Sequence, residues 1–126
     1  LSMHEFSVMS QMVAGIIEEA KKWNATKVEE VVLELGEFTM LGEEQLRFAY
    51  EVLTKDNILK GSVLTIVPIR GAIECDCGFK GEMSPSEDTP HRSVPILECP
   101  KCGGLARITG GRECTVRNLR AVVPDV

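Results

Sequence analysis

Four cysteines stand in two close pairs, a pattern typical of a metal-binding module. A C-x-C pair spans Cys75–Cys77, a C-x-x-C pair spans Cys99–Cys102, and residues 78–98 separate them. In zinc ribbons, two short chelating turns that are remote in sequence are brought together by one metal. Because zinc binds cysteine sulfur as thiolate, the pattern predicts a tetrahedral zinc site with the ligands Cys75, Cys77, Cys99 and Cys102.

The second pair is the more regular of the two. Pro100 stiffens its turn, and Gly103 and Gly104 behind it tolerate positive φ and leave backbone N–H groups free to approach sulfur. The competing interpretation is a disulfide framework. Nothing in the sequence marks the chain as secreted, and in a reducing compartment paired cysteines usually indicate metal. We therefore favour zinc.

The first pair is irregular, because C-x-C is one residue shorter than the usual C-x-x-C turn. Two cysteines at i and i+2 can still face one metal from an extended segment, and Gly78 follows the pair as expected. An alternative keeps the zinc site but replaces Cys75 or Cys77 with His91 or Cys114. Cys114 lies in a strand-like run, and since free cysteine is commonly buried, we expect it to act as a small hydrophobic residue.

The charge of the chain bears on its class of function. The formal net charge is −5 and the sequence pI is about 5.1. Zinc ribbons are common in nucleic-acid machinery, so a zinc-ribbon module that binds nucleic acid or associates with transcription is the alternative function. An acidic chain lacks the basic surface that binding to a phosphate backbone requires. We expect no nucleic-acid partner, and we interpret four arginines near the C-terminus as a solvated strand face: Arg107, Arg112, Arg117 and Arg120.

The sequence disfavours a membrane-spanning protein and a secreted one. The apolar runs are too short to span a membrane, and the N-terminus is amphipathic and acidic rather than a signal peptide. We therefore expect a cytoplasmic protein with no membrane partner.

The cysteine pattern also disfavours an enzyme. Catalytic zinc keeps an open coordination position, whereas four cysteines close the shell. Because the sequence also lacks a phosphate-binding glycine loop and a nucleophile motif, we expect no enzymatic activity.

Hydrophobic periodicity predicts the elements that position these residues. Pro68 favours an edge position for the second strand, and the prolines within residues 83–95 favour a loop. The expected order is helix, strand, helix, strand, zinc module and strand, at residues 3–23, 27–35, 43–54, 62–69, 74–108 and 112–123.

The last strand requires a partner. We expect it to return to the first part of the chain, because the zinc module alone is too small to supply a sheet. The predicted fold is α+β, of the α/β type, with two helices on a three-stranded sheet and an inserted zinc-ribbon module. The expected domains are an α/β domain of residues 1–73 plus 109–126 and a zinc-binding domain of residues 74–108.

His4 is a second residue that could bind metal. A histidine near a free N-terminus chelates strongly, because imidazole, intervening deprotonated amides and the terminal amine form fused rings around one metal. This all-nitrogen square plane suits Ni(II) or Cu(II) rather than zinc. Chains that begin at Met3 or Ser2 make His4 the second or third residue, whereas a start at Leu1 places the amine too far away. Two alternatives stay open: Ser2-x-x-Glu5 matches a helix capping box, and His4 is then an exposed first-turn residue.

These features occur in a specific order along the chain. Met3-His4-Glu5 opens an amphipathic helix, and Val31–Glu37 and Leu46–Leu53 follow before the cysteine pairs and the terminal strand. A Met-His-Glu start combined with a downstream four-cysteine module is far more specific than either part alone. In the order of these features the chain resembles the HypA/HybF family of hydrogenase maturation nickel metallochaperones. The resemblance covers nearly the whole chain from Met3.

The resemblance implies an accessory protein that delivers nickel to the large subunit of [NiFe]-hydrogenase, together with the maturation GTPase/ATPase of the same pathway. It implies Ni(II) as cargo, held by Met3, His4 and Glu5. It also implies structural Zn(II), held by Cys75, Cys77, Cys99 and Cys102. Some relatives carry a histidine between the cysteine pairs that approaches the nickel, which makes His91 a candidate additional ligand. The chain departs from the family pattern in its C-x-C pair and in residues 1–2, which would block the Met3 amine.

Overall fold

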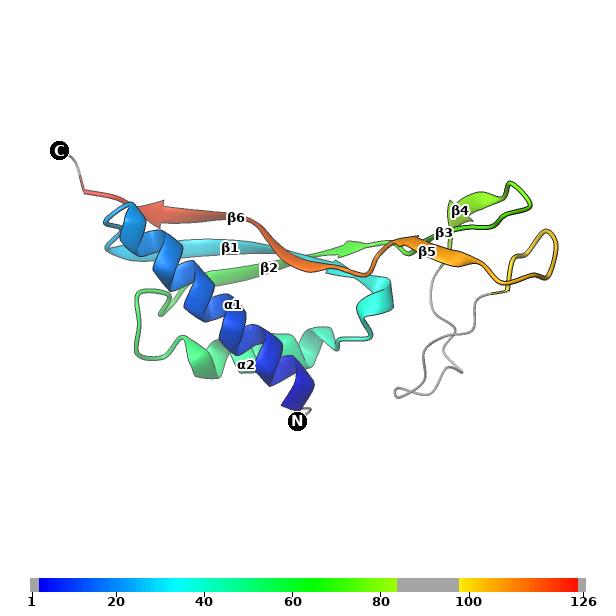
Figure 1. Cartoon of the computed structure of the whole chain (residues 1–126). Coiled ribbons are helices and arrows are strands. Elements are labelled where there is room, and N and C mark those ends of the chain that lie inside the picture. Colours follow the sequence, from blue (N-terminus) through cyan, green and yellow to red (C-terminus); the bar gives the residue numbers. More distant parts are fainter. Residues whose placement is uncertain (1–2, 84–97, 125–126) are drawn as a thin grey trace. The chain divides into compact units, whose positions relative to one another are not determined.

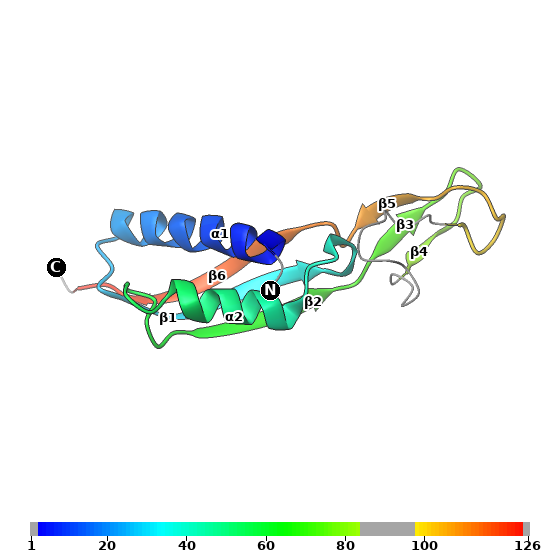
Figure 2. The same ribbon diagram turned by 90° about the horizontal axis from the view of Figure 1, so that it is seen from below.

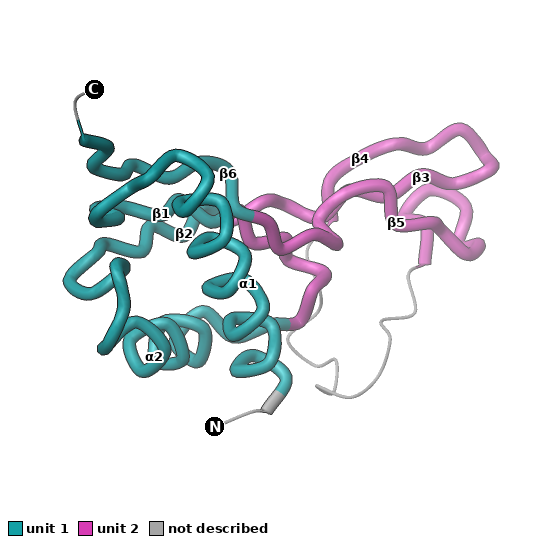
Figure 3. The backbone as a smooth tube through the Cα atoms, turned by 60° about the vertical axis from the view of Figure 1, so that its left-hand side comes forward, with its two compact units in different colours: residues 1–33, 41–67, 116–126 teal, residues 34–40, 68–115 magenta. Residues whose placement is uncertain are grey.

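The structure is a computed structural model that describes residues 3–83 and 98–124 of the chain (Figure 1). The described residues form two compact units (Figure 3). Unit 1 draws on residues 1–33, 41–67 and 116–126, and unit 2 draws on residues 34–40 and 68–115. The chain therefore leaves unit 1 and returns to it twice, so unit 2 contains a short early segment in addition to the cysteine pairs.

Two helices of unit 1 form where the sequence has apolar stripes. Helix α1 spans Met3–Lys22 and buries four residues at three- and four-residue spacing, Met9, Val13, Ile16 and Ala20. It ends before Asn24, whose φ of 56° is left-handed, as expected for a residue that terminates a helix. Helix α2 spans Glu43–Leu53 and buries Leu46, Ala49 and Tyr50. Both helices confirm the predicted ones to within a residue at each end.

The helices cover one face of a three-stranded sheet with the order β2-β1-β6 (Figures 1 and 2). The strands are β1 (Lys27–Gly36), β2 (Val63–Ile69) and β6 (Cys114–Val122). Strand β6 runs antiparallel to β1, since the Thr26 amide donates to the Val122 carbonyl and the Gly36 amide to the Glu113 carbonyl, at 2.9 and 2.8 Å. The prediction that the last strand returns to the first sheet is confirmed, and Pro68 lies on the edge strand β2 as expected.

The core of unit 1 lies between the helices and the sheet. Each large side chain that is fully removed from water contributes about 1.5–3 kcal/mol. The largest such residues in unit 1 come from both layers and from the connection before β2: Met9, Val28, Val31, Leu33, Leu46 and Leu59. Unit 1 therefore has an apolar core of its own that includes none of the four predicted zinc ligands.

Unit 2 contains a second three-stranded sheet with the order β4-β3-β5. Strand β3 (Ala72–Glu74) is central and pairs antiparallel with β4 (Lys80–Glu82) and with β5 (Arg107–Gly110). The prediction that the zinc module is too small to supply a sheet is therefore wrong. Strands of three or four residues are too short for an alternation pattern to reveal them, so hydrophobic periodicity could not predict this sheet.

Phe38 provides much of the apolar packing in unit 2. It lies in the short 3-10 helix η1 (Glu37–Thr39), between the predicted strand at 27–35 and the predicted helix at 43–54. Its ring is 8% exposed and forms a cluster with Ile73, against which four partly buried side chains pack: Phe79, Met83, Ala106 and Ile108. A residue far upstream of the cysteines thus helps to build the core of the module that carries them.

Two glycines allow the backbone segments of unit 2 to pass close to each other. A Cβ atom on Gly36 would lie 2.3 Å from the carbonyl oxygen of Gly111, and Gly111 itself has a φ of 87°. The Phe38 amide donates to that same carbonyl at 2.7 Å. Because a side chain at residue 36 would collide with backbone, glycine is required here for the early segment to pack onto the turn before β6.

Candidate metal centre

The four predicted cysteine ligands come together in unit 2. One sulfur from each of Cys75, Cys77, Cys99 and Cys102 lies within 4.8 Å of every other. The Sγ–Sγ distances are 3.6 Å for Cys75 and Cys102 and 3.6 Å for Cys77 and Cys99. A regular tetrahedron with zinc–sulfur bonds of about 2.3 Å has edges of about 3.8 Å. The four-cysteine cluster therefore has the donors and the size that a tetrahedral zinc ion requires.

The second pair is positioned by a tight turn. The Gly103 amide donates to the Cys99 carbonyl at 2.8 Å, and the Cys99 amide donates to the Gly104 carbonyl at 2.8 Å. The φ of Gly103 is 75°, which glycine adopts without strain. The Gly104 amide donates to the Cys102 sulfur at 3.3 Å, a contact that favours thiolate. Gly103 therefore has the predicted positive φ, and Gly104 supplies the predicted amide contact to sulfur.

The shorter first pair also forms a closed turn. The Cys75 amide donates to the Phe79 carbonyl at 2.9 Å, and the Gly78 amide donates to the Cys75 carbonyl at 3.0 Å. Gly78 has a φ of 99°. Cys75 is buried and Cys77 is exposed, and neither is in a disulfide. A C-x-C pair thus brings both of its sulfurs into the cluster despite the missing residue.

The two cysteines of the second pair differ in their acidity. Burial raises the pKa of the Cys99 thiol, but hydrogen bonds from the Cys102 and Lys101 amides and from Cys77 outweigh burial and lower it to about 7. The Gly104 amide lowers the pKa of Cys102, but the neighbouring Cys75 and Cys77 raise it more, to about 12. Near neutral pH a large fraction of Cys99 is therefore thiolate, whereas Cys102 stays protonated until a metal binds it.

Of the two alternative zinc ligands, Cys114 lies outside this cluster. Cys114 is the first residue of β6, half-buried, and burial raises the pKa of its thiol. It is less buried than the small core residue that the sequence predicted. His91 lies outside the described residues.

The N-terminal candidates lie on the first turn of α1 in unit 1. His4 is exposed, whereas Glu5 is 7% exposed. The Glu5 carboxylate accepts a hydrogen bond at 3.1 Å from the amide of Gly42, the residue that precedes α2. A carboxylate at the start of a helix is favoured by the helix dipole. Glu5 therefore caps α2, a contact between distant segments that the local capping-box pattern did not reveal.

The start of α1 has a property that suits chelation. The first amides of a helix have no carbonyl partner within the helix. The His4 and Glu5 amides belong to this first turn. The exposed His4 imidazole lies on the same turn as these two amides.

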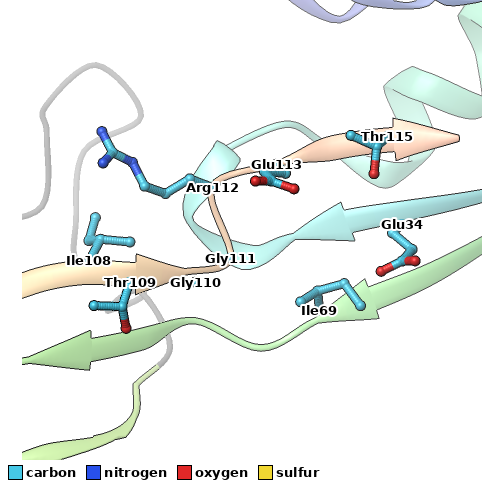
Figure 4. A pocket seen from close by; sticks show the side chains of 9 residues that line it. All are labelled: Glu34, Ile69, Ile108, Thr109, Gly110, Gly111, Arg112, Glu113 and Thr115. Carbon is cyan, nitrogen blue, oxygen red and sulfur yellow. The ribbon is translucent and has the colours of Figure 1, made fainter. Parts of the chain in front are cut away.

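A separate pocket of about 440 Å³ lies within unit 2, where β1 and β2 end and β6 begins (Figure 4). Its charged lining residues are Glu34, Arg112 and Glu113. Because both signs of charge and two threonines share this pocket, it offers no uniform donor set for a metal ion. The four-cysteine cluster remains the stronger metal site of unit 2.

Comparison with known proteins identifies the family. The sequence model of the family described as "Hydrogenase/urease nickel incorporation, metallochaperone, hypA" matches residues 3–121. The chain belongs to the HypA family. The hydrogenase maturation factor HypA of Methanothermobacter thermautotrophicus is 36% identical over 124 residues, which cover 98% of this chain and 100% of that protein. The HypA of Methanocella arvoryzae is also 36% identical, over 121 residues that cover 96% of this chain and all of that protein.

The solved structures agree with this assignment. The solution structure of the nickel metallochaperone HypA from Helicobacter pylori matches with a TM-score of 0.66 at 28% identity, covering 95% of this chain and 98% of that chain. A second HypA solution structure matches with a TM-score of 0.65 at 30% identity, covering 97% and 98%. The predicted HypA resemblance and fold class are thus confirmed, and the family role is nickel incorporation rather than catalysis. No helix within residues 3–83 and 98–124 is long and apolar enough to cross a membrane.

Proposed function

We propose that this chain binds Ni(II) at its N-terminus and delivers it for the maturation of [NiFe]-hydrogenase. The observation that carries the proposal is the match to the nickel-incorporation family over residues 3–121, which begins at the Met-His-Glu motif. The proposed nickel ligands are the Met3 amine, the His4 amide and imidazole, and Glu5. The proposed partners are the maturation GTPase/ATPase and the hydrogenase large subunit, in the cytoplasm.

The position of His4 favours transfer by ligand exchange. His4 is exposed at the end of a helix, so nickel held there keeps open faces. A ligand from a partner can then attach before the old one leaves. Nickel affinity falls with falling pH, because the imidazole and amides must be deprotonated to bind. His91 is a further proposed ligand, supplied from the segment between the cysteine pairs.

Zinc in this proposal is structural and is held by Cys75, Cys77, Cys99 and Cys102. Four thiolates close the coordination shell, so zinc supplies a rigid crosslink. We also propose residues 1–73 plus 109–126 as the nickel-binding domain and residues 74–108 as the zinc-binding domain. Compact unit 2 is larger than that zinc-binding domain, since it also includes residues 34–40.

A transfer assay tests the function directly. A chain that begins at Met3 is loaded with one nickel and one zinc and mixed with the metal-free hydrogenase large subunit and the nucleotide-hydrolysing partner. We expect nickel to move to the large subunit while zinc stays with the chain, because only the nickel site is open. Metal analysis of the separated proteins measures this, and the control is an equal amount of nickel held by a small chelator. Equal transfer from chain and chelator would contradict the proposal.

The zinc site makes a separate prediction about protons. The number of protons released per zinc bound is expected to rise by roughly one between about pH 8 and about pH 6. The reason is that Cys99, with a pKa of about 7, is mostly thiolate at the higher pH and mostly thiol at the lower pH. Titration calorimetry in buffers of different ionisation enthalpy counts the protons. Cys114→Ser should leave the count unchanged, and a count independent of pH would show that Cys99 does not titrate in this range.

A further inference from the structure

The first cysteine pair has an ion pair at the centre of its turn. Asp76 stands between the two ligands, and its carboxylate accepts a hydrogen bond at 2.5 Å from the Arg107 guanidinium. Asp76 comes from the turn after β3 and Arg107 is the first residue of β5. The contact therefore joins the C-x-C turn to the neighbouring strand, at the point where the turn is one residue shorter than usual.

The register of the small sheet explains why Arg107 can reach this turn. On the central strand β3, Glu74 is opposite Lys80 of β4 and opposite Arg107 of β5. The Glu74 carboxylate lies 3.9 Å from each of these two basic groups. Opposite charges at facing positions of neighbouring strands attract each other. Glu74 thus holds the Arg107 side chain on the side of the sheet where it meets Asp76.

When zinc is bound, the negative charge of the site favours a basic side chain nearby. Zinc with four thiolates carries a net charge of −2, and Asp76 adds a negative charge between two of the ligands. Among the residues that the structure describes, Arg107 is the basic group that contacts both acidic neighbours of Cys75. The Asp76 carboxylate raises the pKa of Arg107, both as a hydrogen-bond partner and as a nearby negative charge.

We propose that Arg107 is a positioning residue of the zinc site, which clamps Asp76 and so fixes the C-x-C turn in the geometry that binds metal. This inference rests on the proposed zinc ligands. Asp76 and Arg107 are both exposed, and an exposed ion pair adds little to the free energy of unfolding. The effect of the clamp is therefore expected in how long the metal is retained rather than in global stability.

Removing either partner of the clamp gives a discriminating test. We expect Arg107→Gln to speed zinc release to a chromophoric chelator by about three- to tenfold, less than the roughly 10–100-fold effect of a residue that bonds directly to a metal ligand. Asp76→Asn should also speed release, because it breaks the same clamp. If Arg107 acted only through long-range charge, Asp76→Asn would slow release, since it removes a negative charge beside a negative cluster. The two explanations therefore predict opposite signs for one variant.

Three further measurements complete the test. The double variant should release zinc no faster than the faster single variant, since both remove one interaction. Cobalt substitution should show a weakened or shifted sulfur-to-cobalt absorption in Arg107→Gln, with partial recovery in Arg107→Lys. Arg112→Gln is the matched control, because it removes a positive charge of unit 2 that is not part of the clamp, and it should release zinc at the unmodified rate.

The outcomes separate the clamp from the zinc site itself. An unmodified chain without a stoichiometric cobalt–thiolate band would overturn the proposed zinc ligands. A normal band in the unmodified chain, together with unchanged release in Arg107→Gln or slower release in Asp76→Asn, would overturn the clamp alone. Equal acceleration by Arg112→Gln would also overturn it, because net charge would then be the cause.

Discussion

Replacing His4 with Ala in a chain that begins at Met3 is expected to abolish stoichiometric nickel binding and leave zinc content unchanged. The substitution removes the imidazole that closes the chelate rings. Loss of a group beside a metal ligand already costs about 10–100-fold in affinity, so loss of a ligand should cost more than about 100-fold. Titration calorimetry with Ni(II) measures both stoichiometry and affinity.

The exposure of His4 makes this result interpretable. Exposed substitutions away from special features usually change the free energy of unfolding by less than about 0.5 kcal/mol. Ser7→Ala is a matched control, because Ser7 is also exposed near the start of α1 and has no proposed role in binding. Unmodified affinity and stoichiometry in His4→Ala would refute the proposed nickel site, whereas a loss in both variants would show that the helix start had been damaged.

The larger elements could be predicted because their physical signals are local. The apolar spacing of α1 and α2 and the β-branched residues of β1 and β2 each lie within one segment. The cysteine pairs could be recognised equally well from the sequence, since zinc chemistry restricts both residue type and spacing. These signals sufficed for the fold class and for the four-cysteine cluster.

Other features depend on contacts between distant segments. Phe38 packs on Ile73, and Glu5 accepts a hydrogen bond from Gly42, yet neither pair is adjacent in sequence. The capping-box pattern pointed to the start of Glu5's own helix, whereas the carboxylate contacts the amide that precedes α2. The clamp between Asp76 and Arg107 was missed for the same reason, since only the register of β3 and β5 brings them together.

Removing zinc is expected to open unit 2 and leave unit 1 folded. Bound zinc contributes on the order of 10 kcal/mol or more to modules of this kind. The described core of unit 2 has few fully buried residues besides Ile73, so it cannot replace that contribution, whereas unit 1 has the core between its helices and sheet. Chelator treatment, or Cys102→Ser, should remove amide hydrogen-exchange protection from β3 and β5 and preserve the helical circular dichroism. Cys114→Ser is the control, because Cys114 lies outside the cluster and should retain zinc.

The same experiment determines how far the zinc-dependent structure extends. The Phe38 amide donates to the Gly111 carbonyl, so its exchange reports whether residues 34–40 remain packed in unit 2. Because the Phe38 ring and Ile73 share one cluster, we expect this amide to lose protection together with β3. Protection retained at Phe38 after zinc loss would instead support a zinc-binding domain of residues 74–108 alone. Cooperative loss of the helices together with β3 would contradict a two-part architecture, because the core of unit 1 should then have survived without the metal.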